Sequence, residues 1–217
     1  MKLNTDALLN KWERKLQPYA IPNLMRYIVG GMGIVYVLGL LQGNWAVYNN
    51  LIFLRSAIFQ GQIWRLFTFV FLPPASGALF LIISLYFYDL LGQALESYWG
   101  TARFCLYYLL GYIGALISGL ISGASSNHYL NLSLFLAFAL LNPDFQLLLF
   151  FILPVKVKWL GMIVAVQLVY ELITVSWPMK LALLFSLLNL FLFFGRTAID
   201  RLQQLKRSYE WRKNTRD

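Results

Sequence analysis

Histidine and cysteine are almost absent from this sequence. One cysteine, Cys105, and one histidine, His128, occur in 217 residues. A disulfide within the chain needs two cysteines, and protein zinc sites draw most of their ligands from cysteine and histidine at short spacings. The sequence therefore predicts neither a disulfide nor a metal site, and no motif in it indicates a cofactor.

Charged residues are scarce as well. They make up 12% of the chain, whereas 59% is hydrophobic and the mean hydropathy is +0.63. A soluble domain carries about a quarter charged residues. The composition excludes an ordinary soluble domain and predicts an integral membrane protein. The net charge of +9 comes mostly from residues that flank apolar stretches, which indicates contact with anionic lipid headgroups and not with nucleic acid.

Six apolar stretches are long enough, or nearly so, to cross a bilayer core of about 30 Å. They are residues 24–42, 77–99, 101–121, 125–143, 159–175 and 179–194. The fourth is the shortest in its strongly apolar part, and its whole length gives about 28 Å of helix. The pattern predicts an all-α protein with six transmembrane helices, the fourth of them short.

Three segments follow from this pattern. Residues 1–23 form a cytoplasmic amphipathic segment at the interface, residues 24–195 the membrane domain, and residues 196–217 a basic cytoplasmic tail that also predicts an interfacial helix. Within the membrane domain, residues 43–76 predict a structured loop half inserted in the membrane. Residues 145–153 are too short to span and predict an interfacial connection that stops at Pro154.

Lysine and arginine fix the expected orientation. With six spans, fifteen of these residues fall on one side and three, Arg55, Arg65 and Lys180, on the other. Basic residues concentrate in cytoplasmic loops. We therefore expect both termini in the cytoplasm of a multi-pass protein, in the plasma membrane of a prokaryote.

Small residues recur four apart along the third span, at Gly111, Ala115, Gly119 and Gly123. Small residues on one helix face let a neighbouring backbone come close. The spacing predicts that this helix lies in the middle of the bundle.

Polar side chains inside spans are functional candidates by default, because they are expensive in lipid. The set comprises Asp89, Gln93, Asn131, Gln167, Glu171 and Asn189. Asp89 is either a carboxyl satisfied by a neighbouring helix or part of a proton or ion relay. The second alternative predicts a small transporter or channel that uses Asp89 and Glu171.

Short motifs appear in a recognisable order. Trp64-Arg65 lies in the first loop, Glu96, Gly100 and Arg103 lie at the turn after the second span, and Asn142-Pro143 closes the fourth. This order resembles the rhomboid superfamily over residues 24–195. The resemblance implies a six-helix bundle, a membrane-embedded first loop that Trp64-Arg65 braces, a buried fourth helix, a lateral opening between the second and fifth helices, and local thinning of the bilayer. We expect Glu96 and Arg103 to pair, or to cap backbone, and so to lock their turn.

Active rhomboids use a serine at the start of the fourth helix and a histidine on the sixth, because a serine hydroxyl needs a base within reach. Residues 179–194 contain no histidine. The positions that would help to hold the oxyanion fall on Phe80 and Ser84. The remaining weak candidates are Ser125, Ser126 and His128. The chain therefore resembles the non-catalytic relatives, the pseudoproteases, which include the Derlins of protein quality control.

The sequence leads to three hypotheses. The first is a non-catalytic rhomboid-like protein that binds transmembrane helices of client proteins laterally and thins the bilayer. The second is an intramembrane serine protease with a displaced site at Ser125 or Ser126 and His128. The third is the transporter or channel built on Asp89 and Glu171.

Overall fold

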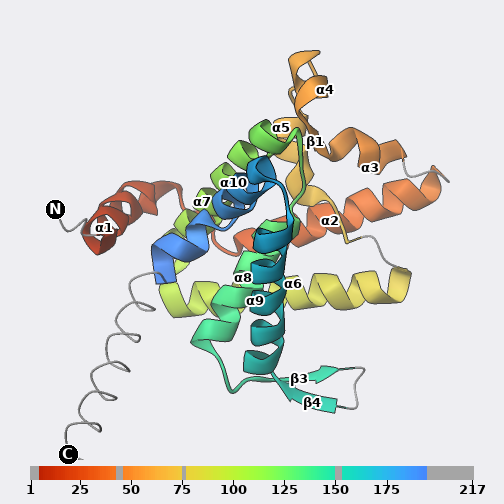
Figure 1. The fold of residues 1–217 in the computed structure, drawn as a ribbon. Coiled ribbons are helices and arrows are strands. Elements are labelled where there is room, and N and C mark those ends of the chain that lie inside the picture. Colours follow the sequence, from red (N-terminus) through yellow and green to blue (C-terminus); the bar gives the residue numbers. More distant parts are fainter. Residues whose placement is uncertain (1–4, 43–45, 75–76, 150–152, 195–217) are drawn as a thin grey trace, which may run out of the picture.

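A computed structural model describes residues 5–42, 46–74, 77–149 and 153–194 of the chain, and Figure 1 shows its mostly helical fold. Four of its helices are long and apolar enough to cross a membrane. They are α2 (Leu24–Leu41), α6 (Ala78–Trp99), α7 (Thr101–Ser122) and α9 (Val157–Thr174). Their apolar residues occupy most of each circumference, which is the pattern of helices surrounded by protein and lipid. The chain is therefore a membrane-embedded helical protein.

Helix α7 is the centre of the bundle. In its most apolar window 61% of the residues are buried, against 33% or less in the other three long helices. It packs against α6, against α8 (His128–Leu141), against α10 (Trp177–Ser186) and against the N-terminal helix α1 (Thr5–Leu16). This is the central position that the glycine spacing predicts.

Helix α8 is shorter than expected. Its 14 residues give about 21 Å of helix, because Ser125 belongs to a strand and the helix runs only from His128 to Leu141. Nearly all of its residues from Leu130 to Ala139 are buried. Protein thus covers the side chains of a helix that is too short for a typical bilayer.

The last apolar stretch is interrupted once. Helix α10 ends at Ser186, Leu187 forms a turn, and residues 188–194 are helical again. The expected interfacial helix of the basic tail lies outside the described residues.

The segment between α2 and α6 is a folded loop of short elements, which we call the first loop. It contains α3 (Ala46–Leu51), β1 (Phe53–Leu54), α4 (Arg55–Phe59), α5 (Arg65–Thr68) and the 3-10 helix η2 (Phe69–Phe71). Strand β1 pairs with β2 (Ala124–Ser125), which follows α7. The first loop is therefore attached to the end of the bundle where α7 ends and α8 begins, the α7–α8 end.

Two features correct the expected all-α fold. One is the β1–β2 pair, and the other is an antiparallel hairpin of β3 (Gln146–Leu149) and β4 (Leu153–Lys156), visible below α9 in Figure 1. The interfacial connection expected at residues 145–153 is thus the first strand of a hairpin and part of its second. Pro154 does not end this structure: it lies in β4 opposite Leu148, and a two-stranded hairpin tolerates a residue without an N–H on its edge.

Helix α1 rests on the opposite end of the bundle, where α6 ends and α7 begins, the α6–α7 end. Leu9 is buried against Leu106 and Leu110 of α7. The 3-10 helix η1 (Gln17–Tyr19) then leads into α2. One apolar face of α1 is therefore used by the protein itself.

Candidate functional site

Arg65 holds the first loop from inside. Its side chain is buried, with 4% exposed. Nη1 donates to the carbonyls of Asn49 at 2.6 Å and Ile52 at 2.8 Å, and Nε donates to Oε1 of Gln62 at 2.7 Å. Buried backbone carbonyls need hydrogen-bond partners, and Arg65 supplies them to Asn49 and Ile52.

Two further side chains fix the loop. The indole of Trp64 donates to the carbonyl of Asn50 at 3.2 Å, so the adjacent tryptophan serves the same stretch of backbone as Arg65. Nη1 of Arg55 donates to the carbonyl of Leu120 at 2.8 Å, and the backbone N–H of Arg55 donates to the carbonyl of Gly123. The first loop is therefore anchored both internally and to the end of α7.

A cavity of about 280 Å³ opens at the α7–α8 end, between the first loop, α6 and the start of α8. Its lining mixes polar and apolar side chains and contains no Lys, Arg, Asp or Glu. It comprises Tyr48, Asn49, Ile52, Leu72, Pro73, Pro74, Tyr88, Ser126, Asn127, His128 and Asn131. Such a lining can hold a polar group by hydrogen bonds. We call it the outer cavity.

Asn127 forms one wall of the outer cavity and is committed to structure. Its buried amide donates to the carbonyls of Val70 at 2.9 Å and Leu72 at 2.7 Å. Asn131 differs, since its Oδ1 is buried and has no hydrogen-bond partner. The side chain of Asn131 also contacts the Tyr88 hydroxyl. An unpaired buried acceptor is costly, so Asn131 Oδ1 is one polar atom of the cavity that a ligand could satisfy.

The candidate protease residues lie together without making a catalytic pair. Ser125 Oγ donates to the carbonyl of Ser126, and Ser126 Oγ accepts from the backbone N–H of His128 at 3.4 Å. The imidazole of His128 is exposed and packs edge-on against Tyr129, with ring centroids 5.2 Å apart. Within the described part of the chain, no hydrogen bond joins either serine hydroxyl to the imidazole.

The positions expected to hold an oxyanion are misplaced. Phe80 is 56% exposed, and neither Phe80 nor Ser84 lines the outer cavity. The residue of α6 that does so is Tyr88, one helical turn beyond Ser84. Neither Tyr88 nor Asn127 was predicted as a site residue. Only Asn127 gives a signal in the sequence, because it directly precedes an apolar helix and asparagine is favoured at helix starts.

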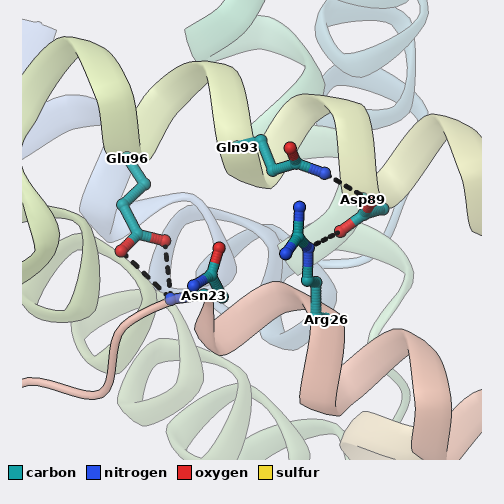
Figure 2. Close-up of polar contacts among 5 residues, drawn as sticks. All are labelled: Asn23, Arg26, Asp89, Gln93 and Glu96. Atoms are coloured by element: carbon teal, nitrogen blue, oxygen red, sulfur yellow. Dashed lines mark hydrogen bonds and ion pairs between the residues drawn. The ribbon is translucent and has the colours of Figure 1, made fainter.

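Asp89 contacts a neighbouring helix, but its carboxylate is only partly paired, because Oδ1 is buried and accepts no hydrogen bond. Arg26 Nε on α2 lies 3.5 Å from its Oδ1, and Gln93 Nε2 donates to its Oδ2. Figure 2 shows this cluster on the facing sides of α2 and α6, with Glu96 further along α6, beside Asn23. The partner Arg26 was not foreseen, because it was counted only among the fifteen basic residues expected on the cytoplasmic side.

The expected pair of Glu96 and Arg103 is not formed. The Glu96 carboxylate accepts from the backbone N–H of Asn23 at 3.1 Å and from Thr101 Oγ1 at 2.8 Å. Glu96 thus caps backbone and locks the turn, whereas the Arg103 guanidinium lies over the ring of Phe193, 5.9 Å from its centroid. Gly100 makes the turn possible with φ at 84°, a value that favours glycine.

The other polar residues of the spans form separate pairs. Glu171 accepts from Tyr129 at 3.2 Å and from Gln167 at 3.0 Å. Asn189 Nδ2 donates to Ser133 Oγ at 2.9 Å. The structure does not bring these groups to Asp89, so they form no continuous relay among the described residues.

The small residues of α7 allow several different segments to pack closely against the helix. A Cβ at Gly111 would lie 2.5 Å from Asn189 Nδ2, and one at Gly119 would lie 2.5 Å from the ring of Phe53. Ala115 is buried, and Gly123 lies beyond the helix with φ at 92°. The closest backbone approach is at Gly114, outside the predicted series, where a Cβ would overlap the carbonyl oxygen of Phe185.

Large apolar side chains are exposed on both of the long helices that pack most closely on α8. Helices α6 and α9 both pack on α8 and make at most a marginal contact with each other. Their most apolar windows are the least buried of the long helices, at 22% and 17%. Large exposed side chains on them include Ile82, Tyr86, Ile163 and Val166. We call this surface the α6–α9 face.

Within the described ranges, no group of three or more His, Cys, Asp or Glu residues is placed to hold a metal ion. No family model and no curated protein matches the chain.

Proposed function

We propose that the chain is a non-catalytic, rhomboid-like membrane protein of six spans that binds transmembrane helices of client proteins at the α6–α9 face and thins the bilayer beside it. The observation that carries the proposal is the arrangement of two exposed apolar helices around one short buried helix. A role in the quality control or handling of membrane proteins would follow.

The α6–α9 face supports lateral binding. Phe87 of α6 packs on Phe135 of α8 with centroids 5.8 Å apart, and Gly161 of α9 lies directly against Ala139 of α8. Because α6 and α9 are held by α8 and not by one another, a foreign helix can contact both without breaking a direct contact between them. Helices associate in lipid through close packing of this kind.

The length of α8 supports thinning. Its roughly 21 Å is well below the hydrocarbon core of about 30 Å. Where lipid comes close to α8, the bilayer would thin to match its short length, whereas the protein packed around α8 would shield the rest of the mismatch. A thinner bilayer lowers the cost of a client helix whose apolar stretch is short or interrupted by polar residues.

The polar chemistry of the α7–α8 end supports a non-catalytic role. The hydroxyls of Ser125 and Ser126 are engaged with backbone, and the imidazole of His128 is exposed beside Tyr129. A serine nucleophile needs a base within hydrogen-bond reach. The protease and relay hypotheses have no geometric observation that favours them.

Six spans are proposed as α2, α6, α7, α8, α9 and the interrupted helix of residues 177–194. With this count the basic residues favour cytoplasmic termini. The α6–α7 end is then cytoplasmic and the outer cavity faces the opposite side.

Position-dependent photo-crosslinking tests the proposal. A photoreactive amino acid replaces Tyr86 on α6 or Val166 on α9, and the control replaces Ile34, which is similarly exposed on α2. The full chain is reconstituted with two single-span peptides whose apolar stretches are about 15 and about 21 residues long, below and at the length that spans a bilayer. We expect adducts from positions 86 and 166, several-fold more with the short peptide, and few from position 34.

Equal labelling from all three positions would show that contact is random collision in the membrane. Adducts with lipid alone from positions 86 and 166 would exclude helix binding at this face. Equal labelling of the two peptides would remove the thinning part of the proposal while leaving lateral binding in place.

A further inference from the structure

A second cavity lies at the α6–α7 end, between the N-terminal helix and the turn that joins the two long helices. Its volume is about 660 Å³. Arg14 and Glu13 reach it from α1, and Trp99, Thr101 and Arg103 from the turn and the start of α7. We call it the inner cavity.

Among the described residues, the charged side chains that line the inner cavity form no ion pair. Arg14, Glu13 and Arg103 take part in none of the ion pairs or side-chain hydrogen bonds of the described residues. Arg103 packs on Phe193, and its Nε is sealed from solvent with no hydrogen-bond acceptor. A guanidinium that is partly desolvated without a counterion is unfavourable, so this site calls for an anion.

The start of α7 adds to the positive side of the cavity. Gly100 precedes the helix and offers no side-chain cap, so the N–H groups of Thr101, Ala102 and Arg103 have no partner within the helix. One carboxylate, that of Glu96, already lies beside this turn and accepts from Thr101 Oγ1 at 2.8 Å. The positive end of the helix dipole favours an anion at the same place. Arg14 from α1, and Arg103 with the first turn of α7, therefore line the same cavity.

Glu13 makes the cavity selective in a further way. It is an unpaired carboxylate in the same lining as the two arginines. A simple anion would leave Glu13 unpaired, whereas a ligand with a phosphate and a tethered primary amine would engage all three charges. Trp99 in the lining is typical of headgroup depth, and α1 lies alongside with Leu9 docked on α7.

We propose that the inner cavity binds the headgroup of an amine-bearing phospholipid such as phosphatidylethanolamine, with the phosphodiester on Arg14 and Arg103 and the ammonium on Glu13. The lipid then joins α1 to the bundle from the membrane side. This site is separate from the α6–α9 face and does not depend on client binding.

Native mass spectrometry of the delipidated full-length protein tests the site. The protein is titrated with phosphatidylethanolamine, phosphatidylglycerol and phosphatidylcholine of the same acyl chains, and separately with inorganic phosphate. We expect phosphatidylethanolamine to bind about tenfold more tightly than phosphatidylcholine, whose quaternary ammonium cannot donate a hydrogen bond to Glu13, because a charge-assisted hydrogen bond is worth about that factor.

Matched variants assign the contacts. Arg14→Gln should weaken the binding of all three lipids about tenfold. Lys11→Gln removes the same charge from α1 outside the lining and should leave lipid binding unchanged. Glu13→Gln should abolish the preference for phosphatidylethanolamine without lowering the affinity for phosphatidylglycerol. Arg103→Gln should resemble Arg14→Gln; if it fails to fold because Phe193 loses its partner, the two α1 variants still decide the matter.

Equal lipid affinities in Arg14→Gln, Glu13→Gln and Lys11→Gln would overturn the proposal. Binding of inorganic phosphate with no retained phospholipid would show a site for a soluble anion and would equally overturn it. A preference for phosphatidylglycerol that Glu13→Gln leaves unchanged would exclude the role given to Glu13.

Discussion

Two helix seams of this protein are closed in different ways. The seam between α7 and α10 depends on a missing side chain, because the carbonyl oxygen of Phe185 occupies the place where Gly114 would carry a Cβ. The seam between α2 and α6 also has a glycine, Gly92, but a side chain, that of Met25, lies against it. It also carries charged groups, which the α7–α10 seam lacks among its described residues.

The difference follows from position. Helix α7 is buried, so it packs against α10 through backbone and small side chains, which allow a close approach of the two helices. The α2–α6 seam is more exposed, and the side chains of Arg26 and Asp89 are 55% and 28% accessible. Such a pair contributes little per interaction, so the seam is expected to tolerate substitution better than the α7–α10 seam. Three substitutions in the seams test this ranking, and a fourth outside both seams gives a reference for a small effect.

The largest effect is expected at Gly114. Gly114→Ala forces a Cβ onto a backbone carbonyl of α10, and backbone cannot yield as a flexible side chain can. We expect a loss of about 3 kcal/mol in the free energy of unfolding, measured by denaturant titration in micelles. Gly30→Ala on α2 is the control, because a Cβ there meets nothing within 4 Å; an equal loss in both variants would refute the steric explanation.

Gly92→Ala should have the next largest effect, a loss of about 2 kcal/mol, because the added Cβ overlaps the side chain of Met25. The double variant Gly92→Ala, Met25→Gly removes the overlapping atoms. It should unfold at a higher denaturant concentration than the sum of the two single changes predicts. Strict additivity would mean that the two residues do not meet.

Asp89→Asn removes one charge of the α2–α6 seam. The pair is partly solvated, so the expected loss is about 0.5–1 kcal/mol. A double-mutant cycle with Arg26→Gln isolates the interaction. A coupling free energy near zero would show that the pair orders the seam without stabilising it, and a value above about 2 kcal/mol would show that lipid surrounds it more closely than its accessibility indicates.

The smallest effect is expected from an ion pair outside the spans. The hydrogen bond from Lys156 and the nearby charge of Lys158 lower the pKa of Asp144. The lowered pKa means that any stabilisation is present above the unfolded-state pKa of about 3.9 and is lost as the pH falls through the lower folded-state pKa. Asp144→Asn should therefore lower the melting temperature slightly at pH 6 and not at pH 2; a larger difference at pH 2 would contradict this sign.

The long helices could be predicted closely from sequence, because their signal is local. The span predicted at residues 24–42 is helix Leu24–Leu41 in the structure, and the span predicted at residues 101–121 is helix Thr101–Ser122. Hydropathy and flanking polar residues decide both limits. The fourth helix was predicted as residues 125–143 and is His128–Leu141, since Ser125 pairs in a strand and Asn127 serves the carbonyls of the first loop.

Contacts between distant segments could not be predicted in the same way. Arg26 was counted as a surface charge because its sequence position is at the start of a span; only the antiparallel register of α2 and α6 brings it to Asp89. The hairpin at residues 146–156 was missed because a leucine run before proline has no period that distinguishes strand from interfacial coil. Tyr88 reaches the outer cavity because of the rotation of α6, which sequence does not specify.

The pairing of β1 with β2 has a consequence for the order of synthesis. The first loop emerges about 70 residues before its partner strand, since Phe53 pairs with Ser125, and domains are made from the N-terminus onward. Until α7 is complete, Arg55 has neither the carbonyl of Leu120 nor that of Gly123 to bind. The first loop can therefore complete its contacts only after α7 and β2 have been synthesised.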